Sequence, residues 1–315
     1  MGAALSLGER GRGRTWPNPN VGCVIVVHDR VVGRGWTQPG GRPHAEAMAL
    51  AEANDLSRGA TLYVTLEPCA HHSARGPACA DAIIAAGIAR VVIAVGDPDP
   101  RTNGDGTNRL RAAGVNVVIG VCTVEAKQQM AGFLIRQQHD RPHVTLKLAM
   151  SIDGAVAMAS GISKWITGEP ARAHGHLMRA RSDAFLVGRR TFEADTPRLN
   201  VRAVDLADRS PQPVLISTSH AQPEGWITLR SLNEIRTIDA DWLLVEGGMG
   251  VAATFLIADM VDTLLVYRAP VLIGGGRTLE NIGLNDLSEV HGRWLAIDSR
   301  RLGSDRLDVY ARLRE

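Results

Sequence analysis

Several features are scarce in this chain of 315 residues, and each scarcity excludes a class of protein. Four cysteines, Cys23, Cys69, Cys79 and Cys122, are too few for the disulfide framework of a secreted protein of this length. No apolar run approaches the roughly 18 residues that a membrane-spanning helix needs, and residues 1–15 do not form a secretory signal. The formal charge is only +2 and aromatic residues make up 4%, so a nucleic-acid surface is not indicated. We expect a cytoplasmic protein that binds neither nucleic acid nor a membrane.

The length and composition favour two globular domains. Apolar residues make up 45% of the chain and charged residues 22%, as in soluble proteins with a packed core. The first half alternates between predicted strands at 21–27, 31–36, 61–66, 90–95 and 115–119 and predicted helices at 44–52, 80–87 and 108–113. This order predicts an α/β domain with a mixed sheet that is covered by helices on both faces.

A second series of elements begins after the polar stretch RQQHDRPH. Strands are predicted at 144–149, 185–187, 214–216, 242–245, 263–267 and 307–313, with helices at 170–180 and 248–258. We place the boundary near Arg141–Pro142, which gives domains of residues 1–141 and 142–315.

The strongest chemical pattern is the run Pro43-His44-Ala45-Glu46, followed by Glu67-Pro68-Cys69 and Pro77-Ala78-Cys79. One histidine and two cysteines supply three zinc ligands and leave a fourth position for water, whose pKa zinc lowers toward about 7. Glu46 stands two residues from the histidine and can shuttle a proton without binding the metal. Either motif alone is equally typical of a core histidine or of structural cysteines, but both together, each beside a predicted helix start, favour zinc. The positive end of its helix is expected to favour a thiolate at Cys79.

The H-A-E and P-C motifs resemble the cytidine deaminase superfamily, but the cysteine spacing differs. Cys79 lies ten positions after Cys69, whereas the nucleobase deaminase signature has a spacing of three, so a standard tRNA or cytidine deaminase is disfavoured. The strings PNPNVGCVIV and VTLEPCAHHSARGPACADAIIAAGIARVVIAVGDPDP resemble the deaminase half of the bifunctional riboflavin biosynthesis family.

This resemblance implies a substrate and a set of roles. The substrate would be a diaminopyrimidinone that carries ribose 5-phosphate, and His44, Cys69 and Cys79 would bind zinc with Glu46 as the proton shuttle. Asn20 would hold the pyrimidine, although its Pro-Asn-Pro-Asn run is also typical of a turn before a strand. His71 and His72 are either substrate contacts or exposed loop histidines.

The second half lacks the G-x-G-x-x-G fingerprint of a Rossmann fold. The segment Glu246-Gly247-Gly248-Met249-Gly250 follows a predicted strand and precedes a helix, so it either cradles a phosphate or forms an ordinary tight turn. The strings TLKLAMSIDG, SKWITG, RARSDAFLVG, ADTPRLNVR, LLVEGG and VYRAPVLIGGG occur in the order of the riboflavin reductase domain, whose fold is similar to that of dihydrofolate reductase.

The resemblance of the second half implies that NADPH transfers a hydride to the ribose C1 carbon and opens the sugar to a ribityl chain. The positions that would contact NADPH are Ala149, Trp165, Thr191, Asp195, Gly248, Met249, Gly250, Val251, Ala252, Ala253 and Thr254. Those that would contact the substrate are Ser163, Arg179, Leu199, Arg202 and Glu246, with Lys147 and Asp153 in support. The run Arg189-Arg190-Thr191-Phe192 and the residue Met249 depart from the family pattern.

Two other functions are compatible with parts of this pattern. The second domain could serve only in binding or assembly, or the chain could be a nucleic-acid deaminase with an accessory domain. The cysteine spacing and near-neutral charge oppose the second alternative. The family resemblance also implies a homo-oligomer, either a dimer or a tetramer, and deamination followed by reduction.

Overall fold

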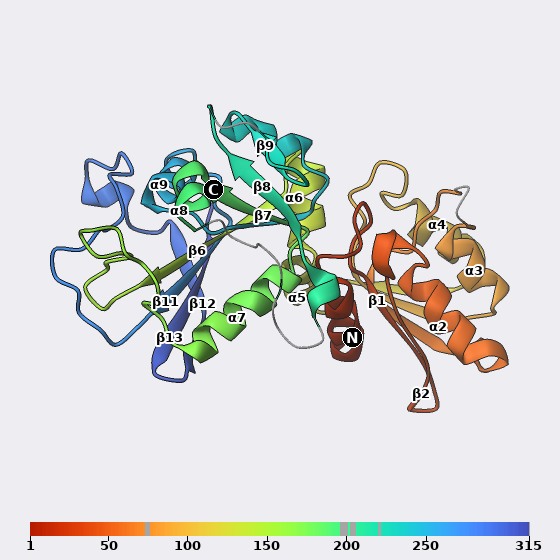
Figure 1. The fold of residues 1–315 in the computed structure, drawn as a ribbon. Helices are drawn as coiled ribbons and strands as arrows, with labels where there is room; N and C mark the ends of the chain where they lie inside the picture. Colours follow the sequence, from red (N-terminus) through yellow and green to blue (C-terminus); the bar gives the residue numbers. More distant parts are fainter. Residues whose placement is uncertain (73–75, 196–200, 202–205, 220–221, 315) are drawn as a thin grey trace. The chain divides into compact units, whose positions relative to one another are not determined.

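The computed structural model describes the whole chain except residues 73–75, 196–200, 202–205, 220–221 and 315. The chain divides into two compact units, Met1–Arg141 and Pro142–Glu315, called unit 1 and unit 2 below (Figure 1). Among the described residues, no helix combines the length and the apolar character that crossing a membrane requires.

Unit 1 is built on a five-stranded sheet in the order β2-β1-β3-β4-β5 (Figure 1). Strand β1 is antiparallel to β2 and β3, and β3, β4 and β5 are parallel, so the predicted mixed sheet is confirmed. Its strands are β1 (Gly22–Val27), β2 (Arg30–Trp36), β3 (Thr61–Leu66), β4 (Arg90–Val95) and β5 (Asn116–Ile119). Its helices are α1 (Gly2–Gly8), α2 (Ala45–Ala53), α3 (Cys79–Ala85), α4 (Asp105–Ala112), α5 (Thr123–Gln129) and α6 (Ala131–His139).

Helices cover both faces of this sheet, as predicted. Alternate residues of a strand point to opposite faces. Cys23 and Ile25 of β1 belong to the core cluster that holds the buried alanines of α2, whereas Val24 packs with Ala4 and Leu7 of α1. The sheet therefore lies between α1 on one side and α2 on the other.

Glycines in β2 allow α2 to lie directly against the sheet. A Cβ atom on Gly35 would stand 2.0 Å from the carbonyl oxygen of Ala45, and one on Gly33 would stand 2.2 Å from that of Ala49. No side chain fits at such distances. This close approach sets the position of α2 and hence of His44 and Glu46 at its start.

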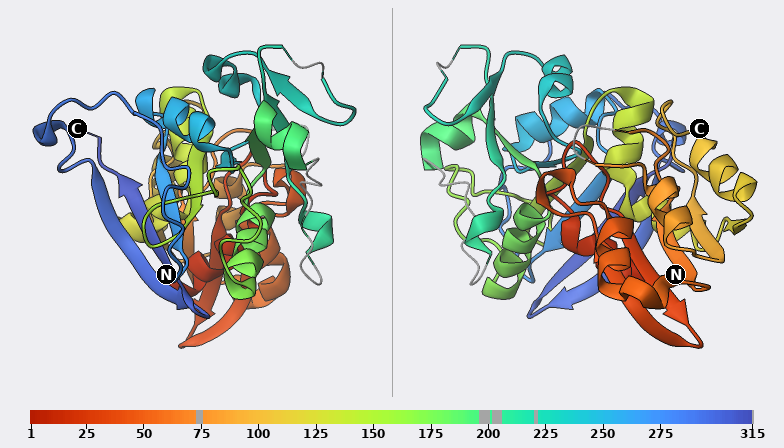
Figure 2. Two further views of the ribbon diagram at one scale, coloured as in Figure 1. Left: turned by 60° about the vertical axis from the view of Figure 1, so that its left-hand side comes forward. Right: turned by 90° about the vertical axis from the view of Figure 1, so that its right-hand side faces the viewer.

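Unit 2 contains an eight-stranded sheet in the order β12-β13-β11-β6-β10-β7-β8-β9. The blue strands in both views of Figure 2 belong to the C-terminal part of this sheet. Strand β13 is antiparallel to β11 and β12, and the other neighbouring strands are parallel. The strands are β6 (His143–Met150), β7 (Ala184–Gly188), β8 (Gln212–Ile216), β9 (Ile227–Leu229), β10 (Trp242–Val245), β11 (Thr263–Arg268), β12 (Trp294–Leu302) and β13 (Asp305–Arg312). The helices are α7 (Glu169–Ala180), α8 (Arg189–Asp195) and α9 (Met249–Ile257).

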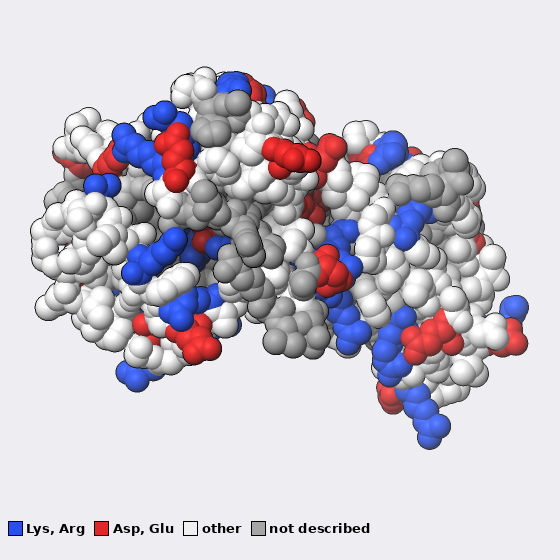
Figure 3. All heavy atoms as spheres, viewed as in Figure 1, with Lys and Arg blue, Asp and Glu red and all other residues white. Residues whose placement is uncertain are grey.

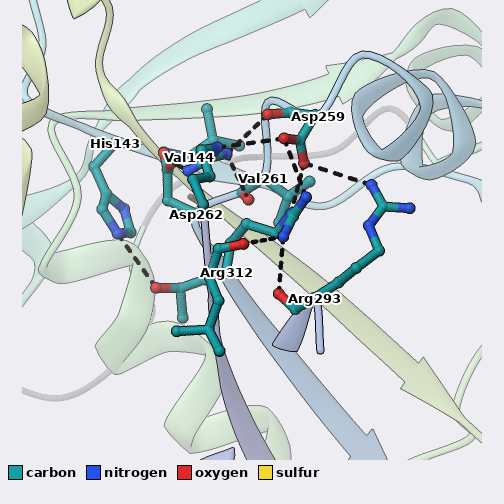
Figure 4. Close-up of polar contacts among 10 residues, drawn as sticks. His143, Val144, Asp259, Val261, Asp262, Arg293 and Arg312 are labelled. Carbon is teal, nitrogen blue, oxygen red and sulfur yellow. Dashed lines mark hydrogen bonds and ion pairs between the residues drawn. The ribbon is translucent and has the colours of Figure 1, made fainter. Parts of the chain in front are cut away.

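A cluster of charged side chains fastens the end of β13 to the rest of unit 2 (Figure 4). Asp262 is buried; one carboxylate oxygen accepts the Val144 N–H at 2.8 Å and the other accepts from Arg314 at 2.6 Å. The neighbouring Asp259 accepts from Nε of Arg312 at 2.7 Å. These bonds hold the end of β13 close to the start of β11, its neighbour in the sheet, and to the start of β6, the strand on the other side of β11.

Candidate active sites

The three predicted zinc ligands meet in unit 1. His44 immediately precedes α2, Cys69 follows β3, and Cys79 is the first residue of α3. Their ligand atoms lie within 4.8 Å of one another, with Nδ1 of His44 at 3.2 Å from Sγ of Cys79 and 3.7 Å from Sγ of Cys69. A tetrahedral zinc with Zn–N and Zn–S bonds of about 2.0–2.3 Å requires ligand separations of roughly 3.5–3.8 Å. The donor set and its spacing therefore fit zinc.

The hydrogen bonds of the cysteines differ from the expectation at the start of α3. We expected the helix end to favour the thiolate of Cys79 itself, but the backbone N–H of Cys79 donates to Sγ of Cys69 at 3.3 Å. The pKa of Cys69 is lowered to about 4, first by a hydrogen bond from the Cys79 thiol and further by His44. The pKa of Cys79 is raised by that same hydrogen bond, by burial and by the charge of Glu46. The N–H groups of the first helical turn point out of the start of the helix. The sulfur that accepts from them here is that of Cys69 and not that of Cys79.

Glu46 lies in the first turn of α2, where its side chain faces the ligands. Only 4% of the residue is exposed, and its carboxyl group hydrogen bonds with the Cys79 side chain. Burial raises the pKa of Glu46, and the charge of His44 opposes this rise. A carboxyl group with a raised pKa, beside the metal ligands but outside the ligand set, is suited to accept and return a proton.

Two asparagines of the run Pro17–Asn20 have different surroundings. Nδ2 of Asn18 donates to the carbonyl oxygen of Gly41 at 2.7 Å and lies 3.1 Å from Nε2 of His44, so Asn18 holds a fixed place beside the ligand ring. Asn18 was not among the predicted site residues, although it belongs to the same Pro-Asn-Pro-Asn run as Asn20. Asn20 is 2% exposed, and its Nδ2 donates to the carbonyl oxygens of Gly8 and Gln129 at 3.3 Å each.

Glu67 is a second residue beside the metal ligands that was not among the predicted site residues. It is buried at the end of β3, and its carboxylate accepts the N–H groups of Asp97, Gly104 and Thr107 at 3.2, 3.1 and 2.9 Å. These bonds fasten the loop between β4 and α4 beside Cys69. The Glu-Pro-Cys motif was the available signal, because a carboxylate directly before a metal ligand is well placed to order the surrounding backbone.

The two loop histidines of unit 1 contact protein groups. His71 lies 3.5 Å from the Thr102 hydroxyl, and Nε2 of His72 lies 3.2 Å from the carboxylate of Asp81. The side chain of His72 is 70% exposed. Neither contact tests whether His71 or His72 binds the substrate, so that role stays a prediction.

Unit 2 holds a large open cavity of about 2260 Å³ at the carboxyl ends of its parallel strands. This is where open α/β sheets bind ligands, and the volume exceeds the roughly 300–1,000 Å³ of a pocket for one drug-sized molecule. The predicted residues that line it are Ala149, Ser163, Trp165, Arg179, Thr191, Glu246, Gly248, Met249, Gly250, Val251 and Thr254. Ala252 and Ala253 are instead buried in the core side of α9. Asp195 ends α8, and Leu199 and Arg202 lie outside the described residues.

The wall of this cavity contains a buried carboxylate between two cations. Glu246 accepts from Nζ of Lys147 at 3.0 Å and from Nη2 and Nε of Arg179 at 3.0 and 3.2 Å. Burial acts to raise the pKa of Glu246, but Lys147 and Arg179 outweigh it and lower the pKa to about 2. The network is therefore ionised at neutral pH, and each member orients the other two.

The glycine-rich turn after β10 forms another part of the wall. Helix α9 begins at Met249, and a Cβ atom on Gly247 would lie 2.7 Å from Cβ of Val251, so the turn requires glycine there. A Cβ atom on Gly248 would have 3.8 Å to its nearest neighbour, the hydroxyl of Thr191, so the turn is open on that side. The N–H groups of the first turn of α9 thus border the cavity, as a phosphate group requires.

Two more predicted residues, Asp153 and Trp165, differ in their relation to this cavity. Asp153 accepts the N–H groups of Gly274 and Ile273 at 2.8 and 3.2 Å, so it holds the loop at Gly274–Gly276, and it does not line the cavity. Trp165 is 70% exposed, and the guanidinium of Arg172 lies 4.9 Å from its ring centroid. Trp165 is therefore a cavity wall and not a core residue.

Comparison with known proteins places both units in one family. The family model for the cytidine and deoxycytidylate deaminase zinc-binding region matches residues 1–95, and that for the RibD C-terminal domain matches residues 142–293. The riboflavin biosynthesis protein RibD of Escherichia coli is 40% identical, over 87% of this chain and 88% of that protein. That of Aquifex aeolicus is 36% identical over 92% and 91%.

Solved structures agree over the full length. The structure of RibD from Acinetobacter baumannii matches with a TM-score of 0.91 and 34% identity, and covers 100% of this chain and 98% of that one. A diaminohydroxyphosphoribosylaminopyrimidine deaminase/5-amino-6-(5-phosphoribosylamino)uracil reductase from Thermotoga maritima matches with a TM-score of 0.88, 32% identity and coverage of 99% and 97%. The chain therefore belongs to the RibD family of bifunctional riboflavin biosynthesis enzymes, which combine a zinc-binding deaminase with a reductase.

Proposed function

We propose that residues 1–141 hydrolyse the ring amino group of 2,5-diamino-6-(5-phosphoribosylamino)pyrimidin-4-one, and that residues 142–315 then reduce the ribose of 5-amino-6-(5-phosphoribosylamino)uracil with NADPH. The observation that carries the first half is the burial of Glu46 against a complete set of zinc ligands. The second half rests on the large cavity that joins a phosphate-binding turn to a buried ionic network.

In the deaminase site, Glu46 is the residue that transfers a proton. Zinc, when bound by His44, Cys69 and Cys79, lowers the pKa of water so that it attacks a ring carbon at neutral pH. Glu46 accepts the proton that this water loses and passes it to the departing nitrogen. The water oxygen thus replaces the amino nitrogen on the carbon, and ammonia leaves.

Asn20 is suited to hold the pyrimidine through its oxygen. Its Nδ2 is occupied by two backbone carbonyl oxygens, which fixes the orientation of the amide. No residue in the described part of the chain donates to Oδ1 of Asn20. That atom is therefore available to accept an N–H of the ring.

In the reductase site the residues around the cavity orient two ligands. NADPH, when bound, supplies the hydride. C1 of the ribose would accept this hydride as its bond to the ring oxygen breaks, and that oxygen would take a proton. The turn of Gly248–Val251 is suited to the cofactor pyrophosphate, with Ala149, Trp165, Thr191 and Thr254 along its path. Arg179 and Ser163 border the space for the phosphoribosyl substrate, and Glu246 holds Arg179 in place.

The order of the two reactions can be tested in one assay. Zinc-loaded protein is mixed with the diaminopyrimidinone ribotide and NADPH, and NADPH oxidation is followed. We expect oxidation by the unaltered chain, none by Glu46→Gln, and its return in that variant when the deaminated ribotide is supplied. No oxidation of NADPH with either substrate would refute the reductase and leave a binding role for unit 2.

We also propose that the chain acts as a homo-oligomer, a dimer or a tetramer. The family resemblance supports this, and light scattering after size-exclusion chromatography measures it directly. A monomer at all concentrations used in the activity assay would refute it.

A further inference from the structure

A tyrosine and a histidine of unit 2 form a hydrogen bond that the proposed reactions do not use. Tyr267 lies in β11 and is fully buried, and His174 lies half-buried in α7. The Tyr267 hydroxyl is 2.7 Å from Nδ1 of His174. Neither residue lines the cavity, so an effect of this pair on the reduction must pass through a neighbour that does.

The two residues meet because α7 packs on the face of the sheet that carries Tyr267. Alternate residues of a strand share a face, so Lys147 and Ala149 of β6 lie on the same face. Tyr267 stands opposite Ala149 in the sheet, and both pack with Ala171 of α7 in one core cluster. His174 follows Ala171 by about one helical turn, which directs it to the same face.

The chemistry of the two groups decides the direction of this hydrogen bond. Burial and the charge of Glu246 raise the pKa of Tyr267, so its hydroxyl keeps the hydrogen at neutral pH. Burial lowers the pKa of His174, and the charges of two nearby arginines act in the same direction. A neutral imidazole has one nitrogen that accepts. Tyr267 therefore donates, and Nδ1 of His174 accepts.

The ring of Tyr267 contacts a residue that does line the cavity. Nζ of Lys147 lies over this ring, 5.7 Å from its centroid, and an ammonium is attracted to the face of an aromatic ring. A Cβ atom on Gly175 of α7 would lie 3.7 Å from Cε of Lys147, so the helix also confines the stem of the lysine. Glu246 accepts from the same ammonium at 3.0 Å. The ring, the helix and the carboxylate together limit where the ammonium can lie.

The place of this ammonium depends on such contacts because the cavity wall is rich in positive charge. Arg172, Arg179 and Arg277 also line the cavity, and Figure 3 shows several Lys and Arg side chains around a recess in unit 2. Neighbouring cations repel one another, and a lysine ammonium stands on a flexible stem. Unlike a guanidinium, it can also release a proton, and the ring oxygen of the ribose needs one when the sugar opens. The position of Lys147 therefore bears on the reduction.

We propose that Tyr267 and His174 are positioning residues of the reductase, because their hydrogen bond fixes the aromatic ring that holds the Lys147 ammonium at the cavity wall. This inference rests on the proposed reductase function and adds two residues that act on the site through Lys147. Since neither of them lines the cavity, their loss should lower the rate of the bound complex and leave substrate binding nearly unchanged.

The test follows reduction of the deaminated ribotide with NADPH by the full chain, well below its melting temperature. Tyr267→Phe keeps the ring and removes the hydroxyl, and His174→Ala removes the acceptor. Each should lower kcat about 3- to 10-fold, as for the loss of one hydrogen bond, with the ribotide KM changed less than about twofold. Both changes break the same bond, so the double variant should lose no more than either single one. Tyr310→Phe is the matched control, because Tyr310 lies in β13 and does not line the cavity.

Acid should break the same bond. A protonated imidazole has no nitrogen that accepts, so Tyr267 would lose its partner. The pKa of His174 is lowered from 6.5, so kcat should hold at neutral pH and fall only as the pH drops below 6.5. His174→Asn, whose amide oxygen can accept from the hydroxyl, should keep most of the rate and lack this fall. His291→Asn, the same change at an exposed histidine outside the cavity, should retain it. The groups whose charge or hydrogen bond acts on His174 are Tyr267 of β11, Arg300 and Asp298 of β12, and Arg181, which follows α7.

Three results would overturn the positioning role. One is an unchanged kcat in Tyr267→Phe and His174→Ala, even where the melting temperature falls, because the pair would then serve stability alone. Another is a double variant whose loss is the product of the two single losses. The third is an acid limb that is the same in His174→Asn and in the unaltered chain. Ammonia release by unit 1 in the same preparation, together with the melting temperature, shows that each variant is folded.

The proposed function fails in a different way. If the unaltered chain oxidises no NADPH with the deaminated ribotide, the reductase proposal itself is wrong. If it does so and both single variants keep its kcat and its pH profile, only the role of Tyr267 and His174 is wrong.

Discussion

The two candidate sites differ in how much of their geometry is local. The zinc ligands of unit 1 come from the starts of two helices and the end of one strand, and their ligand atoms lie within 4.8 Å of one another. The unit 2 cavity is about 2260 Å³ and takes its walls from the ends of β6, β7, β8 and β10 together with their loops. A metal needs a few atoms at short distances, whereas a dinucleotide and a ribotide need a long surface.

This difference determines how each site responds to a single substitution. Replacing one ligand abolishes zinc binding, because the site has only three protein ligands and needs all of them. A broad cavity distributes its contacts, so one change weakens binding without abolishing it. The predictions below test this contrast, starting with the largest effect.

Replacing His44 with Ala should remove zinc and deamination together while reduction persists. The two cysteines that remain are too few for a site that binds zinc firmly at neutral pH. Zinc is measured by metal analysis, ammonia release with the diaminopyrimidinone ribotide, and NADPH oxidation with the deaminated ribotide. Reduction that fell as steeply as deamination would show that the sites are not independent.

Replacing Glu246 with Gln should destabilise unit 2 and change its response to acid. The substitution leaves Lys147 and Arg179 close together without their shared carboxylate, and removal of one partner from a buried ionic network costs about 3–5 kcal/mol. The pKa of Glu246 is about 2 in the folded chain and 4.5 is its ordinary value. A carboxyl group with a lowered pKa contributes stability that is present above about pH 4.5 and is lost as the pH falls toward 2.

The measurement is thermal unfolding of the unaltered chain and of Glu246→Gln between pH 7 and pH 3. The unaltered chain should lose more of its melting temperature in the acid part of this range than the variant does. Parallel curves for the two proteins would contradict the ionised network.

The contrast between the sites also explains which features were predictable from sequence. Zinc ligands must be His, Cys or acidic residues, so the pairing of His44 with Cys69 and Cys79 was visible in the residue types alone. The cavity residues were found mainly through family resemblance, because glycines, alanines and single arginines are common in any domain.

The helices and strands also differ in how well the sequence predicted them. Strands β3, β4 and β10 begin and end where the buried apolar runs predicted, whereas β12 was missed. Its residues are exposed or half-buried throughout, so it carries no alternation of apolar and polar positions. Helix α6 was also missed, since its polar last turn was taken for the start of a linker. Apolar runs in the sequence therefore predict an element only where most of its residues are buried.

Replacing Asn18 with Ala should weaken zinc about 10- to 100-fold without removing it. Its amide lies 3.1 Å from Nε2 of His44, and loss of a group that orients a metal ligand has effects of this size. Zinc affinity is measured by competition with a chelator. At saturating zinc, the variant should recover most of its deamination rate, which would show that Asn18 positions the ligand and is not catalytic. A rate that stays low at saturating zinc would contradict this positioning role.

Replacing Asn20 with Ala should give the smallest change in zinc affinity and a different kind of loss. The carbonyl oxygens of Gly8 and Gln129 would lose their donor inside the protein, which costs about 1–3 kcal/mol of stability in unit 1. If Oδ1 of Asn20 also accepts from the pyrimidine, the KM for the ribotide should rise while zinc content stays unchanged. The ribotide KM of Asn20→Ala, measured well below its melting temperature, decides between these roles. An unchanged KM with a lowered melting temperature would make Asn20 a residue that only joins α1 to α5, and would leave Asn18 as the residue of this run that acts on the site.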